Sequence, residues 1–198
     1  MKNLSSQIAL LVLCLFLWTP AIQSQNSQTG QWSPVIDAEV IPVAAANLPD
    51  GRILAWSAKA KLSFGGNEGK TYTTIFDPAN NTFTDRLVSE TGHDMFCPGT
   101  ANLADGRIMI TGGSSSEKTT IYNPSNNTYT NGPDMNTPRG YHAMVTLSDG
   151  RVFTVGGSWS GGRGNKNGEV WSEQNGWTAY SDITADNSIR QGAPDPNG

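Results

Sequence analysis

Three copies of an Asp-Gly-Arg triplet divide the chain into repeats, and this feature restricts the fold more than any other. The triplets begin at Asp50, Asp105 and Asp149, and a short run of apolar or β-branched residues follows each one. An Asp-Gly pair between two such runs is typical of a tight β-hairpin turn. Each repeat then continues with a second pair of runs around a polar turn: TTIFDPANNTFT, TTIYNPSNNTYT and GEVWSEQNGWT. Each repeat therefore predicts four short antiparallel strands.

Repeats of this length and strand content are typical of a propeller blade. The three triplets are 55 and 44 residues apart, and Gly-Gly pairs suit the close backbone approach where blades converge. We predict an all-β fold, a kelch-type β-propeller, with about three four-stranded blades over residues 25–198. Because a propeller closes with roughly four to eight blades, we expect this domain to be incomplete at its C-terminus. The missing blades would come from a longer chain or from a second polypeptide.

The first 24 residues have the pattern of a secretory signal peptide. Lys2 precedes an apolar run from Ile8 to Trp18, and Ala21 and Ser24 are small residues suited to cleavage. The apolar run is too short to span a bilayer. We therefore expect a secreted, extracellular or periplasmic protein that has no membrane attachment after cleavage of residues 1–24.

Charge and cysteine content exclude some classes of function. The chain carries a net charge of −4, which disfavours binding to nucleic acid. Of the two cysteines, Cys14 lies in the predicted signal peptide, so Cys97 remains without an intramolecular disulfide partner. An unpaired cysteine in an exported protein is either a small buried apolar residue or a reactive group.

The repeat register brings a thiol and a phenol to equivalent places. Cys97 and Tyr141 each lie eight residues before the Asp of the next triplet. We expect both to begin the first strand of a blade, nearest the axis. Trp159 follows a Gly-Gly pair and Phe64 precedes one, so antiparallel strand order predicts all four side chains on one face. Each aromatic residue alone is typical of core packing between blades, whereas their convergence indicates a site.

The motifs around these residues resemble those of galactose oxidase and its copper-radical oxidase relatives. The motifs are HDMFCPG, PRGYH with SDGRVF, and GGSWSGG followed by KNGEV, and the resemblance extends over nearly all the chain after the signal. It implies a seven-bladed propeller of which this chain is the N-terminal part. It also implies catalytic roles for Cys97, Tyr141 and Trp159: a thioether joins Cys97 to Tyr141, Tyr141 binds copper, and Trp159 stacks over the thioether and shields a tyrosyl radical. Phe64 is implied to line the substrate pocket.

The resemblance further implies an alcohol oxidase. Copper(II) and the thioether-linked radical together accept two electrons from a primary alcohol, either a sugar or a small alcohol or aldehyde, and O2 is reduced to H2O2. The family takes two histidine ligands and an axial tyrosine from later blades, so we expect residues 1–198 alone to be inactive. His142 alternates to the opposite side of its strand from Tyr141, and we expect His93 to make a structural hydrogen bond.

Two other readings remain open at the level of sequence. A kelch propeller can serve only as a module that binds a protein or a glycan, and a truncated, inactive gene product would carry the same residues. A thiol placed near the axis has no use in a binding propeller, so Cys97 favours the enzyme.

Overall fold

The computed structural model describes residues 32–157, 159–162 and 164–185. The predicted signal peptide, residues 1–24, lies outside the described residues, as do both ends of the predicted propeller domain. The chain divides into two units, residues 1–36 and 37–198, and every described strand belongs to the second. Within the described ranges, no helix has the length and apolar character needed to cross a membrane.

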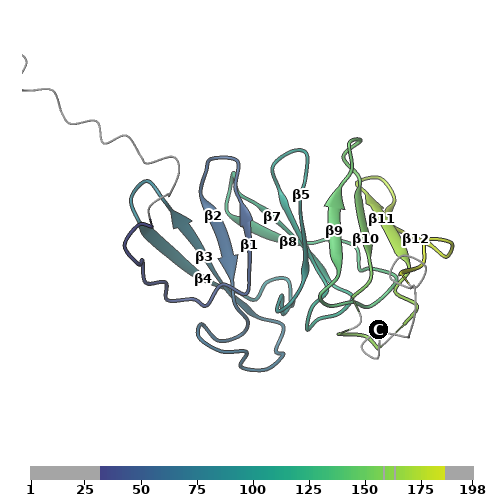
Figure 1. Ribbon diagram of the computed structural model, residues 1–198, viewed down its shortest axis with the longest axis horizontal. Coiled ribbons are helices and arrows are strands. Elements are labelled where there is room, and N and C mark those ends of the chain that lie inside the picture. The colour runs from purple at the N-terminus through teal and green to yellow at the C-terminus, as the bar shows by residue number, and fades with distance from the viewer. Residues whose placement is uncertain (1–31, 158, 163, 186–198) are drawn as a thin grey trace, which may run out of the picture. The chain divides into compact units, whose positions relative to one another are not determined.

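Three four-stranded antiparallel sheets make up the second unit (Figure 1). Each sheet is a meander in chain order, so the predicted all-β, blade-like repeat is confirmed. Blade 1 contains β1 (Ala44–Asn47), β2 (Ile53–Trp56), β3 (Thr71–Asp77) and β4 (Thr82–Val88); blade 2 contains β5 (Gly99–Asn102), β6 (Ile108–Thr111), β7 (Thr119–Asn123) and β8 (Thr128–Asn131); blade 3 contains β9 (Ala143–Thr146), β10 (Val152–Val155), β11 (Gly168–Ser172) and β12 (Gly176–Tyr180).

The Asp-Gly-Arg triplets form the turns between the first two strands of each blade, as predicted. In the first triplet the Asp50 carboxylate accepts hydrogen bonds from the Arg52 backbone N–H at 3.1 Å and from Arg52 Nε at 2.8 Å. Gly51 between them has φ 87°, which is the left-handed region where a side chain would be strained. The other two triplets repeat the same bonds.

The apolar core lies between neighbouring blades. Strand β6 is buried on both faces, with Ile108 and Ile110 packed toward blade 1 and Met109 packed toward blade 3. This alternation is the period-2 geometry of a strand that has sheets on both sides. Trp56 lies in the first of these two cores and Trp171 in the second. Burial of each large apolar side chain contributes about 1.5–3 kcal/mol, so the blades stabilise one another by stacking.

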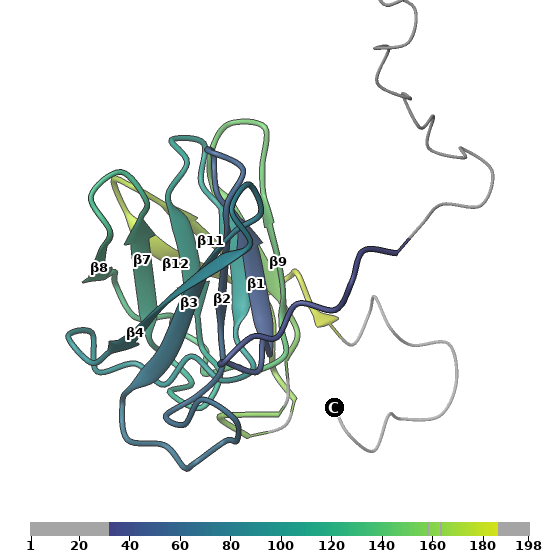
Figure 2. The same ribbon diagram turned by 90° about the vertical axis from the view of Figure 1, so that its left-hand side faces the viewer.

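The first strand of each blade is the innermost one. Strand β5 contacts both β1 and β9, and a side view has β1 and β9 on one side of the sheets with β4 and β8 on the other (Figure 2). The inner strands therefore have two distinct ends. The turn end contains the three triplets at 50–52, 105–107 and 149–151. The loop end contains segments 91–98 and 133–142, which lead into β5 and β9.

Candidate active site

Cys97 and Tyr141 occupy equivalent positions at the loop end. Each lies two residues before an inner strand, β5 or β9, rather than within the strand as the sequence predicted. The reason is their backbone conformation, with φ 60° for Cys97 and φ 57° for Tyr141, which does not fit a strand. Five described non-glycine residues have positive φ, and the other three are asparagines. Strain of this kind in a cysteine and a tyrosine is characteristic of functional sites.

The two side chains are in contact. The Tyr141 backbone N–H donates to the Cys97 carbonyl at 2.9 Å, and the Cys97 thiol and the Tyr141 phenol are hydrogen-bond partners. Cys97 is buried, whereas the Tyr141 side chain is 63% exposed. Burial raises the pKa of the Cys97 thiol, although its bond with Tyr141 acts in the opposite direction. That same bond, followed by burial, raises the pKa of the Tyr141 phenol. Both groups are therefore protonated at neutral pH.

A chain of aromatic rings leads away from the pair on one side. Trp159 meets the Tyr141 ring edge-on, with centroids 5.2 Å apart and planes at 63°. Phe96 contacts Trp159 at 6.1 Å and Phe64 at 4.8 Å. The structure thus brings Phe64, Tyr141 and Trp159 to one end of the sheets, as the strand order predicted. The edge-to-face contact of Trp159 with Tyr141 is an arrangement that the ring quadrupoles favour.

Phe96 is a member of this site that the sequence analysis missed. It connects Phe64 to Trp159, so Phe64 reaches the Cys97–Tyr141 pair only through two other rings. Phe64 also lies eight residues beyond the end of β2, in the connection to β3, rather than directly at the strand end. The position of Phe96 immediately before Cys97 in the HDMFCPG motif was the available signal.

Trp159 rests on the backbone of the segment that carries Tyr141. A Cβ atom on Gly140 would lie 2.5 Å from Trp159 Cε3, so only glycine leaves room for the indole there. A Cβ atom on Gly161 would lie 2.1 Å from Pro138 Cβ. The glycines of PRGYH and GGSWSGG therefore permit close approach of two loops, which explains why these motifs are rich in glycine.

Both histidines are structural. His93 is fully buried, with Nδ1 2.9 Å from Thr120 Oγ1 and Nε2 2.8 Å from the Gly112 carbonyl, as expected for a structural hydrogen bond. His142 Nε2 is 2.8 Å from Thr111 Oγ1. Burial lowers the pKa of His93 to about 4 and, with the charges of nearby basic residues, that of His142 to about 3. Both imidazoles are thus buried and hydrogen-bonded to other residues, whereas Tyr141 is exposed.

The described residues at the loop end could supply one ligand to a copper ion. Copper(II) accepts oxygen ligands, and the exposed Tyr141 phenol presents an oxygen that an ion can reach. A bound cation would also offset the raised pKa of the phenol, since it stabilises the phenolate directly. Among the described residues no group of three or more His, Cys, Asp or Glu side chains is arranged to hold a metal. If copper binds at the loop end, Tyr141 would be a residue that presents an oxygen to it.

A buried charge network lies behind the site, and the sequence analysis did not identify it. Arg139 and Glu169 are both buried and form an ion pair at 2.8 Å. Arg139 also donates to the carbonyls of Gly156 at 2.9 Å and Lys166 at 3.2 Å. Burial raises the pKa of the Glu169 carboxyl, but Arg139 and Asn136 outweigh it and the net pKa is lowered. The ion pair therefore joins the segment ending in Tyr141 to β11 and to the loop that contains Trp159.

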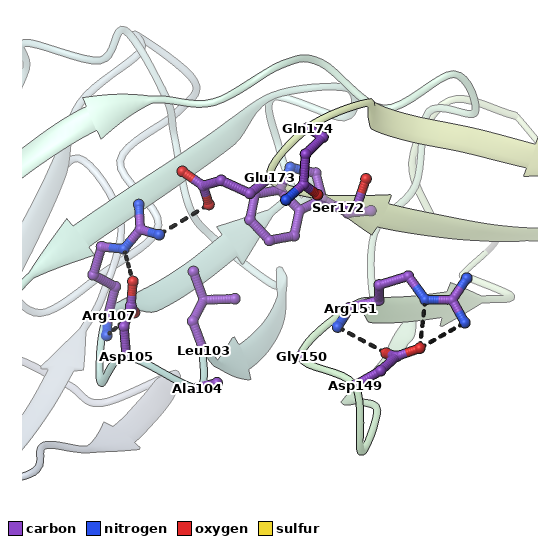
Figure 3. Close-up of a pocket in the computed structure, with 11 residues that line it drawn as sticks. Leu103, Ala104, Asp105, Arg107, Asp149, Gly150, Arg151, Ser172, Glu173 and Gln174 are labelled. Carbon is purple, nitrogen blue, oxygen red and sulfur yellow. Dashed lines mark hydrogen bonds and ion pairs between the residues drawn. The ribbon is translucent and has the colours of Figure 1, made fainter.

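A cavity of about 460 Å³ is found at the turn end, away from these residues (Figure 3). Arg107 and Arg151 from two successive triplets line it, each paired with the aspartate of its own triplet, and Glu173 bonds Arg107 at 2.9 Å. It is a cleft between blades 2 and 3 that contains no member of the Cys97–Tyr141 pair or its ring cluster. The candidate chemistry is at the opposite end of the inner strands.

Comparisons with known proteins agree with the fold. No protein-family model matches the chain. Two curated galactose oxidase sequences from Gibberella zeae, one of them from strain PH-1, are each 48% identical over 153 residues, which cover 76% of this chain and 22% of the relative. A solved structure described as a novel fungal alcohol oxidase of the AA5 family, in complex with copper, matches with a TM-score of 0.67 and 39% identity, covering 75% of this chain and 32% of that chain.

These findings identify the second unit as part of a β-propeller of the kind found in copper-containing alcohol oxidases. Over its matched part, the chain belongs to the galactose oxidase-like family. It spans 22% of the length of the curated relatives that it matches.

Proposed function

We propose that this chain contributes a cross-linked cysteine–tyrosine pair and its aromatic surroundings to a copper-radical oxidase. The enzyme would convert a primary alcohol, either a sugar or a small alcohol, to an aldehyde and reduce O2 to H2O2. The observation that carries the proposal is the contact between Cys97 and Tyr141, two residues at equivalent repeat positions and in the same strained backbone conformation. A module that only binds proteins or glycans has no need for such a pair.

The cross-link requires a balanced oxidation. A bond between Cys97 Sγ and a ring carbon of Tyr141 forms as the S–H bond and one ring C–H bond break. Two protons and two electrons leave the protein, and one molecule of O2 takes them to become H2O2. The buried thiol and the phenol already touch, so the chain brings the two reacting groups together before any oxidant is present.

The residues of the site would have separate tasks during turnover. Bound copper, together with the radical on the cross-linked ring, supplies the capacity to accept two electrons. Tyr141 would bind the ion through its phenol oxygen, and the sulfur of Cys97 would ease oxidation of the ring. Trp159, supported by Phe96, would shield one side of the Tyr141 ring from water and reductants. Phe64, at the far end of the ring cluster, would line the path of the substrate.

The remaining copper ligands would come from residues other than those described. Tyr141 is the single candidate ligand at the loop end, and one phenolate does not hold copper(II) firmly. We therefore propose that residues 1–198 alone have no oxidase activity. We also propose that the protein is exported, since the pattern of residues 1–24 is that of a signal peptide.

Intact-mass measurement of the full-length protein tests the proposal. After copper loading in air, the mass should fall by on the order of 2 Da, because two hydrogens are lost on cross-linking. Peptide mapping should place the link between Cys97 and Tyr141. Residues 1–198 expressed alone should keep the unlinked mass. Recovery of Cys97 as a free, alkylatable thiol from active, copper-loaded protein would contradict the cross-link and leave the binding-module function as the better reading.

A further inference from the structure

Lys166 is an unusual lysine because its charged end is enclosed by backbone carbonyls instead of carboxylates or water. Its side chain is only 4% exposed, and Nζ donates to the carbonyls of Pro138, Ser160 at 3.0 Å and Gly161 at 3.1 Å. An ammonium group has three hydrogen-bond donors, so these carbonyls satisfy it completely. Burial, and then the charge of Arg139, lower its pKa.

The three carbonyls belong to two different loops. Pro138 is in segment 133–142, which contains Tyr141, whereas Ser160 and Gly161 follow Trp159 in the loop after β10. Lys166 therefore connects the backbone that carries the phenol to the backbone that carries the indole. Burial of the Lys166 ammonium group is unfavourable in free energy. The hydrogen bonds that offset this cost also hold the two loops together.

The position of Trp159 depends on how closely these loops approach each other. The contact between Gly161 and Pro138 and the contact between Gly140 and Trp159 leave no room for a single methyl group. By contrast, the pairing of Cys97 with Tyr141 uses its own backbone bond at 2.9 Å and does not involve Lys166. Loss of Lys166 would thus release Trp159 without separating the thiol from the phenol.

We propose that Lys166 is a positioning residue for the radical site. Its ammonium group holds Trp159 against the Tyr141 ring, and it thereby maintains the shielding that the indole gives to one side of that ring. The effect of Lys166 on the lifetime of a radical rests on the function proposed above. Its effect on the position of Trp159 does not depend on that function.

Hydroxyl-radical footprinting of the copper-free, full-length protein tests the geometry directly. Lys166→Met keeps an unbranched side chain, one atom shorter, and removes its donors. Because the Trp159 residue is 48% exposed, its oxidation rate should rise by up to about twofold when the two loops separate. Lys61→Met is the matched control, since the Lys61 ammonium also bonds more than one partner, here Glu39 and Asp85, and bonds neither loop. The control should leave Trp159 labelling at the wild-type rate.

Two further measurements separate this inference from the proposed function. In copper-loaded Lys166→Met the cross-link mass change should persist while the radical decays faster than in wild type. If no radical or cross-link forms in any variant but Trp159 labelling still rises, the positioning role stands and the oxidase proposal fails. Unchanged Trp159 labelling in folded Lys166→Met would overturn the positioning role.

Lys166→Arg covers the possibility that the methionine variant does not fold. Arginine keeps the charge, but its planar fork cannot direct three donors at carbonyls that converge on one point. Trp159 labelling should therefore rise above the wild-type rate, by less than in Lys166→Met. A folded arginine variant with wild-type labelling and wild-type radical lifetime would equally contradict the inference.

Discussion

The two ends of the inner strands use charge in opposite ways. At the turn end, three aspartate–arginine pairs lie within single triplets, are largely exposed, and repeat from blade to blade. At the loop end, Arg139, Glu169 and Lys166 are buried, and their bonds connect segments that are about 30 positions apart in the chain. The turn end is thus a repeated structural element, and the loop end is where the repeats differ.

The contrast has a physical basis. An exposed ion pair contributes little to stability and needs only local geometry, so one triplet can be reused in each blade. A buried ion must be saturated by hydrogen bonds, and it is strongly destabilising when one partner is lost. The buried charges at the loop end are therefore specific to the segments that carry Tyr141 and Trp159.

The first repeat lacks the backbone conformation of the site. Pro42 stands there at the position of Cys97 and Tyr141, and proline cannot adopt their positive φ.

Cys97→Ser should have the largest effect of any single change, and the effect should fall on activity. We expect turnover of the full-length enzyme to drop by at least ~100-fold, because the cross-link and the sulfur that eases oxidation of the ring are both lost. Copper binding should persist, since Tyr141 keeps its phenol. Initial rates of peroxide formation and copper titration measure the two effects.

The matching change at the turn end is Gly150→Ala, which forces a side chain into φ 85°. It should lower stability by about 1 kcal/mol and leave turnover per folded molecule unchanged. If Cys97→Ser retained wild-type turnover, or if Gly150→Ala abolished it, the functional division between the two ends would be wrong.

Glu169→Gln should have the largest effect on stability. It removes the negative charge that Arg139 pairs with in a fully buried setting, so we expect a loss of about 3–5 kcal/mol in the free energy of unfolding. Asp149→Asn, in an exposed pair of the turn end, should remain close to wild type. Chemical denaturation of both variants provides the comparison, and equal losses would show that burial does not distinguish the two ends.

Gly140→Ala should displace Trp159, because the new Cβ would lie 2.5 Å from Trp159 Cε3. Overpacking of this kind costs about 1–3 kcal/mol. The radical of the copper-loaded enzyme should also decay faster. Gly132→Ala is a matched control, since its Cβ would lie 2.7 Å from Thr119 Cγ2, away from the site. It should lower the melting temperature without changing the lifetime of the radical.

The buried histidines should make the stability of the fold depend on pH, and this effect should be smaller than those of the substitutions above. The pKa is about 4 for His93 and about 3 for His142 in the folded state, below the value of 6.5 that applies when the chain is unfolded. The unfolded chain therefore binds more protons, and stability should fall as the pH drops from 6.5 toward 4. Asp94, whose pKa burial raises to about 6, binds a proton in the folded state and acts in the opposite direction.

Between about pH 5 and 6 the two histidines outweigh the one aspartate by up to one proton, which corresponds to at most about 1.4 kcal/mol per pH unit. Below that range, carboxyls whose pKa is lowered, such as Glu169, add to the same slope. Thermal unfolding at several pH values measures the slope. His93→Gln should flatten it, and an unchanged slope in that variant would assign the dependence to other groups.

The blades and their turns were predictable from the sequence because they depend on local chemistry. An Asp-Gly-Arg triplet forms its turn through bonds within three residues, and strand alternation follows from the same short range. The equal repeat positions of Cys97 and Tyr141 also anticipated their contact. The prediction that they begin strands was wrong, since a positive φ in a non-glycine residue leaves no pattern in the sequence.

The sequence by itself therefore determined the repeat, the blade count and the residues that gather at the loop end. Tertiary structure alone decided how those residues are held: the edge-on contact of Trp159 with Tyr141, the insertion of Phe96, and the buried network of Arg139, Glu169 and Lys166. These features depend on which carbonyls and rings of separate loops come within hydrogen-bonding or van der Waals range. Such distances arise only when the blades stack, because they join residues about 20 to 60 positions apart and no local propensity specifies them.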